Sequence, residues 1–382
     1  VELRNVEITN YSAVTAPRYG VLIQGGGSVS DRGGAIKGVR LFNVNVHDVS
    51  SETNRSYGGI VVTCASAASP VWFEDLTIDG CSVTNSGANG ISVKSDWCIR
   101  GAMGEEWSVG DWTPSTNLKL CNTYVEACAG DGIWVSVTKN ALLTNNICNN
   151  TSYGNNTAYA GIWPHNSDGC IMQNNEAYGQ ILAGNDAQGF DVDINCQDTT
   201  VQYNYSHDND GGFLLICTYG AEGYWNRNVI VRYNLSENDR QYIFSLGGKL
   251  TNVKIYNNTV YIPENSGANL MSVTEWGYNV SATGLDVFNN LFYVAGNGFS
   301  SGFVPSAEYT FRNNMYFGAV SHRPIGTDDL LMDPKIVKPG GGPAGYKLKN
   351  DSPCIDKGVN TGVTGLKDFF GQSIVDACDI GM

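Results

Sequence analysis

The sequence predicts an all-β solenoid, in which the chain winds through stacked coils of three short strands. Glycine is abundant and proline scarce, with 46 and 11 residues among 382, and only 16% of residues are charged. This balance is typical of strands joined by many turns. An asparagine recurs in a similar context every 24 to 32 residues, and apolar runs opened by glycine recur with it. Such self-similarity indicates a repeat fold.

Each repeat contains an asparagine at a turn between two strand-like runs, such as TVQY before it and YSH after it. This repeat resembles the parallel β-helix of pectate-lyase-like proteins, in which inward asparagines stack as a ladder at a tight turn, and the resemblance implies the same ladder here. A buried ladder position excludes a glycan, although two of the asparagines, Asn204 and Asn234, begin Asn-x-Ser/Thr sequences. The asparagines expected in the ladder are Asn122, Asn146, Asn175, Asn204, Asn234, Asn258, Asn290 and Asn314.

A third strand follows later in each repeat and is usually opened by glycine. Apolar residues alternate with others along it, which is the pattern of a strand with one buried face. The predicted strands are 59–64, 90–95, 132–137, 161–166, 189–194, 212–217, 242–247 and 269–274.

The order strand, asparagine turn, strand, glycine-opened strand resembles the right-handed parallel β-helix of pectate-lyase-like carbohydrate-active proteins. The resemblance covers residues 1–318 and implies that they form a right-handed parallel β-helix catalytic domain with an asparagine ladder. From residue 319 the repeat lapses into a sequence rich in proline and glycine. We expect 319–382 to be a C-terminal cap segment packing on the last coils, because an open end would expose the core and a strand edge.

The net charge of the chain limits the classes of partner that it can bind. The net charge is −14, from 23 basic and 37 acidic residues, so nucleic acid and anionic membranes are poor partners. No apolar run reaches the roughly 20 residues that span a bilayer. The chain begins within a strand-like run, VELRNVEITN. We therefore expect a secreted, extracellular or periplasmic protein whose signal peptide is not in this chain, and a monomer.

Cysteine spacing predicts no metal site, because none of the 11 cysteines forms a C-x-x-C pair. The sequence does not decide whether Cys354 and Cys378 form a disulfide.

The candidate catalytic residues lie on strand 189–194. Phe190 and Val192 share one side of this strand, and Asp191 and Asp193 share the other, because side chains alternate. The two carboxylates therefore face outward together. Aligning neighbouring coils about 4.8 Å apart places His165 beside Asp193, where a carboxylate would raise the pKa of the imidazole.

Aromatic and basic side chains are expected around this carboxylate pair. Trp134 and Trp163 stack in adjacent coils and offer a flat surface for sugar rings. Long loops at 95–117 and 218–226 add further aromatic residues, and long loops in a regular solenoid are usually functional. The expected substrate-binding residues are Lys94, Trp107, Trp112, Trp134, Trp163, Tyr219 and Trp225.

Two further expectations follow from the same alignment. Asp210, just before strand 212–217, is the reserve candidate for a third catalytic carboxylate; the alternative is a turn residue. Four apolar residues are expected to face outward and to be covered by a loop or the cap, or to line an apolar subsite: Leu214, Ile216, Phe244 and Leu246.

The predicted function is a glycoside hydrolase acting on a poly- or oligosaccharide. Glycosidic cleavage needs one carboxyl group that donates a proton and a second that activates water or attacks the anomeric carbon. Asp191 and Asp193 supply this pair, His165 tunes it, and no cofactor is required. The strand spacing leaves retaining and inverting mechanisms open. The alternate carboxylates resemble those of iota-carrageenase-like hydrolases.

Two alternatives stay open. The first is a polysaccharide lyase in which Asp191 and Asp193 bind calcium and Lys94 or His165 is the base. The resemblance to calcium-dependent pectate lyases is only local, because Ala187 and Leu214 stand where a calcium carboxylate and the lysine base are expected. The second is a non-catalytic glycan-binding β-helix. Polygalacturonase activity is not expected, because the Gly-His-Gly and Arg-x-Lys motifs are absent.

Overall fold

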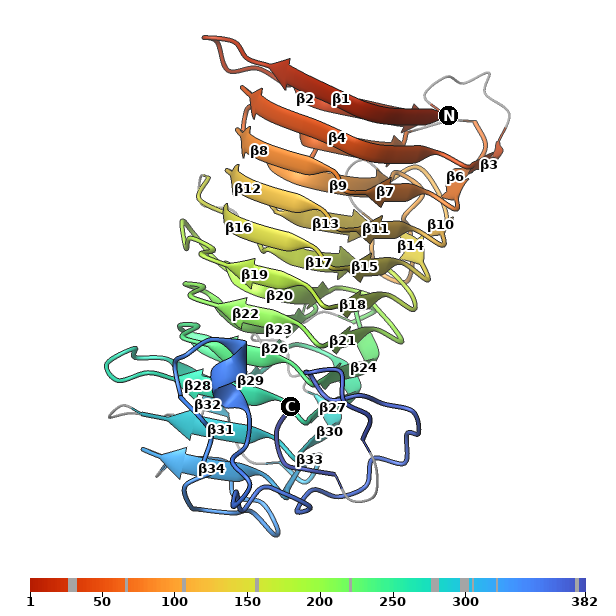
Figure 1. The fold of residues 1–382 in the computed structure, drawn as a ribbon. Helices are drawn as coiled ribbons and strands as arrows, with labels where there is room; N and C mark the ends of the chain where they lie inside the picture. Colours follow the sequence, from red (N-terminus) through yellow and green to blue (C-terminus); the bar gives the residue numbers. More distant parts are fainter. Residues whose placement is uncertain are drawn as a thin grey trace.

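The computed structural model describes residues 1–26, 33–65, 68–104, 108–154, 158–219, 222–275, 282–295, 302–303, 306–320, 322–374 and 378–382. Within them the chain forms parallel strands that stack coil upon coil in chain order, from the red to the light blue end of Figure 1. The predicted parallel β-helix is confirmed.

Twenty strands form two adjoining columns that join at the long strands β1 and β4. The first column contains β1 (Glu2–Asn10), β4 (Arg40–Val49), β7 (Thr77–Asp79), β11 (Lys119–Cys121), β15 (Leu142–Thr144), β18 (Ile171–Gln173), β21 (Thr200–Gln202), β24 (Asn226–Arg232), β27 (Leu250–Tyr256), β30 (Thr283–Phe288) and β33 (Tyr309–Arg312). The second contains β8 (Ser82–Ser86), β12 (Tyr124–Cys128), β16 (Ile147–Thr151), β19 (Glu176–Tyr178), β22 (Tyr205–His207), β25 (Leu235–Glu237), β28 (Thr259–Ile262), β31 (Leu291–Val294) and β34 (Met315–Gly318).

The glycine-opened strands form a third column of ten. It contains β2 (Tyr19–Gly25), β5 (Gly58–Cys64), β9 (Asn89–Ser95), β13 (Ile133–Ser136), β17 (Ile162–His165), β20 (Gln188–Asp193), β23 (Gly212–Cys217), β26 (Tyr242–Gly247), β29 (Asn269–Thr274) and β32 (Gly302–Phe303). A short sheet contains β3 (Gly34–Lys37), β6 (Val71–Glu74), β10 (Ser115–Thr116) and β14 (Thr138–Lys139), and the C-terminal segment contains the 3₁₀ turn η1 (Pro343–Tyr346). No helix in the described ranges is long and apolar enough to cross a membrane.

Aliphatic and aromatic side chains from the three columns fill the interior in one continuous core. All eleven cysteines are described and buried, and no disulfide joins any two of them. The disulfide left open for Cys354 and Cys378 is therefore not formed, and these thiols pack as small apolar groups.

The predicted asparagine ladder runs from Asn146 to Asn314. Each side-chain amide donates to the carbonyl oxygen of the next ladder asparagine at 2.9 or 3.0 Å. The ladder ends where the Asp329 carboxylate accepts the backbone N–H of Asn314 at 3.0 Å. Asn204, at the middle of the ladder, is fully buried, so its sequon cannot carry a glycan in the folded protein.

Asn122 was assigned to this ladder wrongly. It is exposed and has a left-handed backbone with φ of 55°, and Thr123 occupies the ladder position, where its hydroxyl donates to Asn146 Oδ1 at 2.7 Å. The other coils place a left-handed residue, such as Asn145 or Asn174, directly before the ladder asparagine. Asparagine suits both positions, so a single asparagine in the sequence does not identify which one it fills.

The register of the third column agrees with the alignment as far as β20. Ser136 pairs with His165 and His165 with Asp193. In the next coil, however, Asp193 pairs with Cys217, because Gly212 pairs with Gln188 and not with Gly189. Gly212 has φ of 119°, and a Cβ there would lie 2.0 Å from the Tyr242 carbonyl oxygen.

This one-residue shift reverses the two faces of the later strands. The expectation that Leu214, Ile216, Phe244 and Leu246 face outward is wrong: all four are fully buried in the core. The outward positions of β23 are Leu215 and Cys217, which follow Asp191 and Asp193 in the column.

The C-terminal segment lies along the outside of the later coils, as the dark blue trace in Figure 1 shows. Its residues Ile336, Tyr346, Cys354 and Ile380 bury apolar surface against β25, β31 and β34. The side chain of Asn257 also donates to the backbone oxygens of Asp379 and Gly381, at 2.8 Å each.

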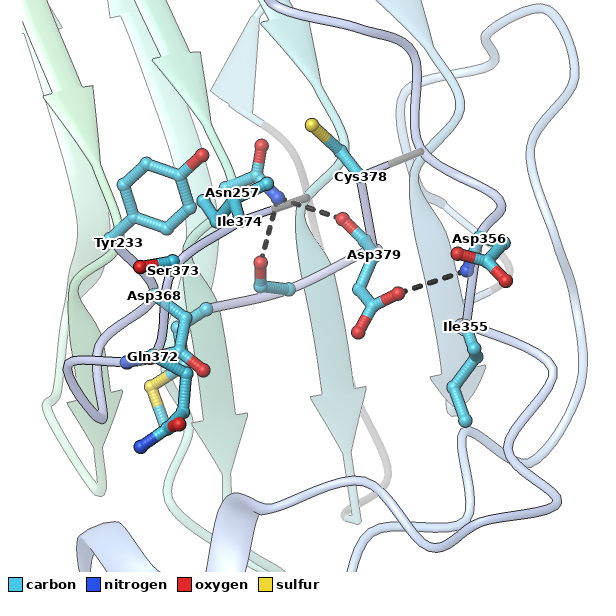
Figure 2. A pocket seen from close by; sticks show the side chains of 12 residues that line it. Tyr233, Asn257, Ile355, Asp356, Asp368, Gln372, Ser373, Ile374, Cys378 and Asp379 are labelled. Carbon is cyan, nitrogen blue, oxygen red and sulfur yellow. Dashed lines mark hydrogen bonds between the residues drawn. The ribbon is translucent and has the colours of Figure 1, made fainter. Parts of the chain in front are cut away.

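A cavity of about 320 Å³ lies between this segment and the turns after β24 and β27. Figure 2 shows Tyr233 and Asn257 on the solenoid side, with Asp368, Gln372 and Asp379 contributed by the C-terminal segment. None of the residues predicted to be catalytic or substrate-binding lines this cavity.

Candidate active site

Three carboxylates converge on a second pocket, of about 350 Å³, at the C-terminal end of β20. Asp191 and Asp193 come from β20 itself, and Asp186 comes from the loop before it. The pocket is lined by Arg55, Ala158, Asn185, Asp186, Asp191, Asp193, Ile194, Cys217, Thr218 and Tyr219.

The backbone is unusual on both sides of β20. Asp186 and Ala187, which precede the strand, have φ of 67° and 64°, and Ile194 and Asn195, which follow it, have φ of 24° and 59°. A positive φ is rare for any residue with a Cβ and rarest for a β-branched one such as Ile194. Strained backbone of this kind clusters at functional sites.

Asp191 lies at the buried floor of the pocket and is 3% exposed. Its Oδ1 atom has no hydrogen-bond partner among the described residues. Burial, together with repulsion from Asp193 and Asp186, raises the pKa of Asp191 well above its usual value. Burial and the neighbouring carboxylates therefore favour the protonated form of Asp191.

Asp193 is half-buried, and its Oδ1 atom accepts a hydrogen bond from the Cys217 thiol at 3.0 Å. Burial raises the pKa of Asp193 to about 6, while the Cys217 hydrogen bond and the Arg55 charge oppose the rise. Asp193 is thus mostly ionised at neutral pH.

Asp186 is half-exposed at the pocket, and the sequence analysis missed it. Burial and repulsion from Asp193 raise its pKa to about 7, which suits a group that must give and take a proton near neutrality. It escaped notice because only strand residues were aligned. An acidic residue three positions before Gly189 was the one available signal.

Arg55 is the second residue that was missed. It lies in the loop before β5 and its Nε donates to Asp131 at 3.0 Å, while Nη2 donates to the backbone oxygen of Ala158. Burial disfavours the guanidinium charge, but attraction to Asp131 and Asp193 outweighs it and raises the pKa of Arg55. A permanent positive charge therefore faces the carboxylates.

Trp134 and Trp163 stack as predicted, with ring centroids 5.7 Å apart. They do not form an open platform, because they are 4% and 2% exposed. The Arg55 guanidinium lies over both rings, at 6.0 and 5.0 Å, and Asp131 accepts the Trp163 Nε1–H at 3.0 Å. The two rings instead form the surface on which the Arg55 guanidinium packs.

His165 lies beside Asp193 in the register, but the direction expected for its pKa was wrong. The imidazole is 7% exposed, and its Nδ1 is hydrogen-bonded to Ser136 Oγ at 2.9 Å. Burial, reinforced by the Arg55 and Arg100 charges, lowers its pKa to about 3. The ring therefore stays neutral at any pH at which the protein would work.

Lys94 and Asp210 do not line the pocket. The Lys94 ammonium donates to Ser56 Oγ at 3.1 Å, and burial lowers its pKa. The Asp210 carboxylate accepts from Arg240 at 3.1 Å and from the Leu182 N–H at 3.3 Å, which is the bonding of a turn residue.

The loop aromatics divide into two groups. Tyr219 is 54% exposed and lines the pocket. Trp112 and Trp225 instead enclose the Arg100 guanidinium at 4.1 and 4.9 Å and thereby hold loop 95–117 against the turn after β20. Trp107 lies outside the described residues.

One group of side chains at the pocket could hold a metal ion. A single donor atom from each of Asp191, Asp193 and Cys217 lies within 4.8 Å of the other two. No other such group of three or more acidic, histidine or cysteine side chains is found in the described ranges.

Comparison with known proteins relates the chain to glycan-degrading β-helices. No protein-family model matches it. The chain is 27% identical, over 91% of its length, to a lacto-N-biosidase of Bifidobacterium longum subsp. longum, of which the match covers 24%. The native structure of a GH136 lacto-N-biosidase from Eubacterium ramulus superposes with a TM-score of 0.58 and 20% identity, covering 79% of this chain and 49% of that chain.

The complex of XylC with xylose superposes with a TM-score of 0.53 at 12% identity, covering 81% of this chain and 55% of that chain. The chain thus spans about a quarter of the curated relative and about half of each of these two structures. At these identities the structural likenesses establish the fold, which is the parallel β-helix found in carbohydrate-active proteins.

Proposed function

We propose that this chain is a glycoside hydrolase that cleaves an oligosaccharide in the pocket at the end of β20. The observation that carries the proposal is the convergence of Asp186, Asp191 and Asp193 on one pocket of about 350 Å³. The likeness to the two lacto-N-biosidases supports it and suggests glycosides of lacto-N-biose as the first substrates to test.

The environments of the carboxylates support the following roles. Of the two half-buried carboxylates, Asp186 has the higher pKa, about 7 against about 6 for Asp193. Asp186 is the general acid that protonates the leaving oxygen. Asp193 is ionised, faces Arg55, and attacks the anomeric carbon to form a glycosyl ester. Asp186, now deprotonated, then removes a proton from water, which hydrolyses the ester and releases the sugar. The configuration is retained.

Asp191 takes a supporting role in this proposal. At 3% exposure it is the least accessible of the three carboxylates that line the pocket. Protonated, it relieves the repulsion that a third negative charge would exert on Asp193.

The experiment compares D186N and D193N on p-nitrophenyl lacto-N-bioside and on an oligosaccharide ending in lacto-N-biose. Nitrophenolate leaves without protonation, so D186N should keep most of its first-step activity on the aryl glycoside and lose about 10²–10⁴-fold on the oligosaccharide. D193N should lose activity on both substrates. Added azide should restore its turnover of the aryl glycoside and give a glycosyl azide of inverted configuration.

D198N is the matched control, because Asp198 is an exposed turn carboxylate that lies outside the pocket. It should match wild-type activity within about twofold. Azide rescue of D191N in place of D193N would transfer the nucleophile role to Asp191. Full activity in all three pocket variants would end the proposal, and so would a product absorbing as an unsaturated uronate, the signature of a lyase.

A further inference from the structure

We propose that Asp191, Asp193 and Cys217 form a binding site for a thiophilic divalent cation, such as Zn²⁺ or Cd²⁺, at the floor of the pocket. The site itself is independent of the proposed function. Its consequence, inhibition by the bound cation, rests on the proposed function.

The first argument is the arrangement of the donors. Asp191 and Asp193 alternate on β20, and Cys217 pairs with Asp193 on the adjacent strand β23. Three atoms within 4.8 Å of one another lie within roughly 2.8 Å of a common point. Zinc binds sulfur and oxygen at about 2.0–2.3 Å. Side-chain movements of under about 1 Å would therefore bring the three donor atoms to three of the four ligand positions of a tetrahedral ion.

The second argument is the unpartnered oxygen. Asp191 is 97% buried and lines the pocket, yet its Oδ1 atom has no partner among the described residues. A buried polar atom normally has a hydrogen-bond partner, and an orphan requires an explanation such as an unseen ion. A cation between the three donors satisfies this atom.

The third argument concerns which cation the donors select. A thiolate is a soft ligand that favours zinc and its heavier relatives, whereas calcium takes six to eight oxygen atoms. Two carboxylates and one sulfur leave the fourth position of a tetrahedral ion open to water or substrate. Asp186 adds a further acidic group near the pocket, and Arg55, which opposes a cation, is already paired with Asp131.

An ion at this position would block the proposed reaction. It would bind the same Asp193 oxygens that attack the anomeric carbon, and the Cys217 thiol would lose the proton that it donates to Asp193. The spacing rule applied to the sequence missed this site, because its ligands come from adjacent strands and not from one C-x-x-C segment.

The test titrates EDTA-dialysed protein with Co²⁺ and records the thiolate-to-cobalt charge-transfer absorption. Wild type should develop the band with about one equivalent, and Zn²⁺ should remove it by displacement. C217S keeps the other ten cysteines and should show no band. D191N should keep the band but bind cobalt at least about tenfold more weakly. The exposed-carboxylate variant D198N should behave as wild type.

Two results would overturn the site: no band in wild type, or an unchanged band in C217S with the fold verified by circular dichroism. Activity is measured separately. Zn²⁺ should inhibit the wild type, and the residual activity of C217S should be less sensitive to it. A cobalt band that depends on Cys217, in a protein without glycosidase activity, would contradict the proposed function and support the cation site. Glycosidase activity in a protein that shows no cobalt band would contradict the cation site and support the proposed function.

Discussion

At the residue scale, the pocket depends on how differently three nearby carboxyl groups bind protons. Burial raises the pKa of all of them, but only Asp193 receives a hydrogen bond from a thiol. Groups with pKa values pushed apart are what a paired acid and nucleophile require. In the proposed reaction, Cys217 would therefore act through Asp193.

Replacing Cys217 by alanine should shift the pH dependence of kcat/KM. The thiol hydrogen bond lowers the pKa of Asp193, so without it this pKa should rise above about 6. Since Asp193 must be ionised to attack, the acidic limb should move to higher pH. The profile is measured with EDTA present, to keep cations from the site.

C217S is the control, because serine keeps a donor at the same position. Its acidic limb should stay nearer that of the wild type than the limb of C217A. Identical limbs in C217A and C217S would show that the thiol has no effect on Asp193.

Strand alternation alone predicted which residues of β17 and β20 become neighbours, and the structure pairs His165 with Asp193 accordingly. The sequence could not supply Asp186 and Arg55, because loops place them and loop paths do not follow from periodicity. The pKa of His165 is lowered first by burial and further by two arginines, Arg55 and Arg100, that come from such loops.

At the element scale, the asparagine ladder fixes the coils to one another. The side chain of Asn204 shows how many hydrogen bonds one ladder position makes. Its Oδ1 atom accepts two N–H groups of Asn175, and its amide donates to Asn234 and to the Met172 carbonyl. All of these groups are buried, so removing the side chain takes a hydrogen bond from each of them, although Asn234 Oδ1 keeps the Asn204 N–H and the Asn175 amide keeps the Leu143 carbonyl.

The variant N204A should lower the free energy of unfolding by about 2–4 kcal/mol, because leaving buried polar groups unpaired carries their full desolvation penalty. Asn122 offers a matched control, since its amide donates to Asp79 on the exposed surface. N122A should change stability by no more than about 1 kcal/mol. Urea unfolding of both variants measures the difference, and equal losses would contradict a special role for the buried ladder.

The elements also show where the sequence was insufficient. The repeat and most of the register could be predicted, because glycine opens the strands and Asn turns recur. The shift at β23 could not, because the repeated glycine suggests that Gly212 aligns with Gly189, whereas the structure pairs Gly212 with Gln188. The backbone of Gly212 decides it, and this is visible only in three dimensions.

At the scale of the whole molecule, the buried acids make stability depend on pH. The folded pKa values of Asp186, Asp193 and Asp239 are about 7, 6 and 6, each raised mainly by burial. The folded state therefore binds more protons than the unfolded chain below these values, and stability falls as pH rises through them. His165 acts in the opposite sense, because its folded pKa is lowered, so stability is lost as pH falls below about 6.5.

Three carboxyl groups outweigh one imidazole, so the midpoint of thermal unfolding should be higher near about pH 5.5 than near about pH 8. In D193N the amide cannot ionise, and this variant should gain stability at the higher pH more than at the lower one. Thermal unfolding followed by circular dichroism at both pH values tests this. A midpoint that is the same at both values would contradict the assignment of these acids as buried and proton-binding.

The long-range contacts of Arg55 limit where the solenoid can gain or lose a repeat. The side chain bonds to Asp131 and Ala158, which follow it by 76 and 103 residues, so it bridges coils that otherwise contact only their immediate neighbours. Insertion or loss of one repeat between β5 and β17 would leave every coil well packed and still carry the arginine away from the acids. Recombination that exchanges repeats should therefore abolish the pocket when it falls inside this interval.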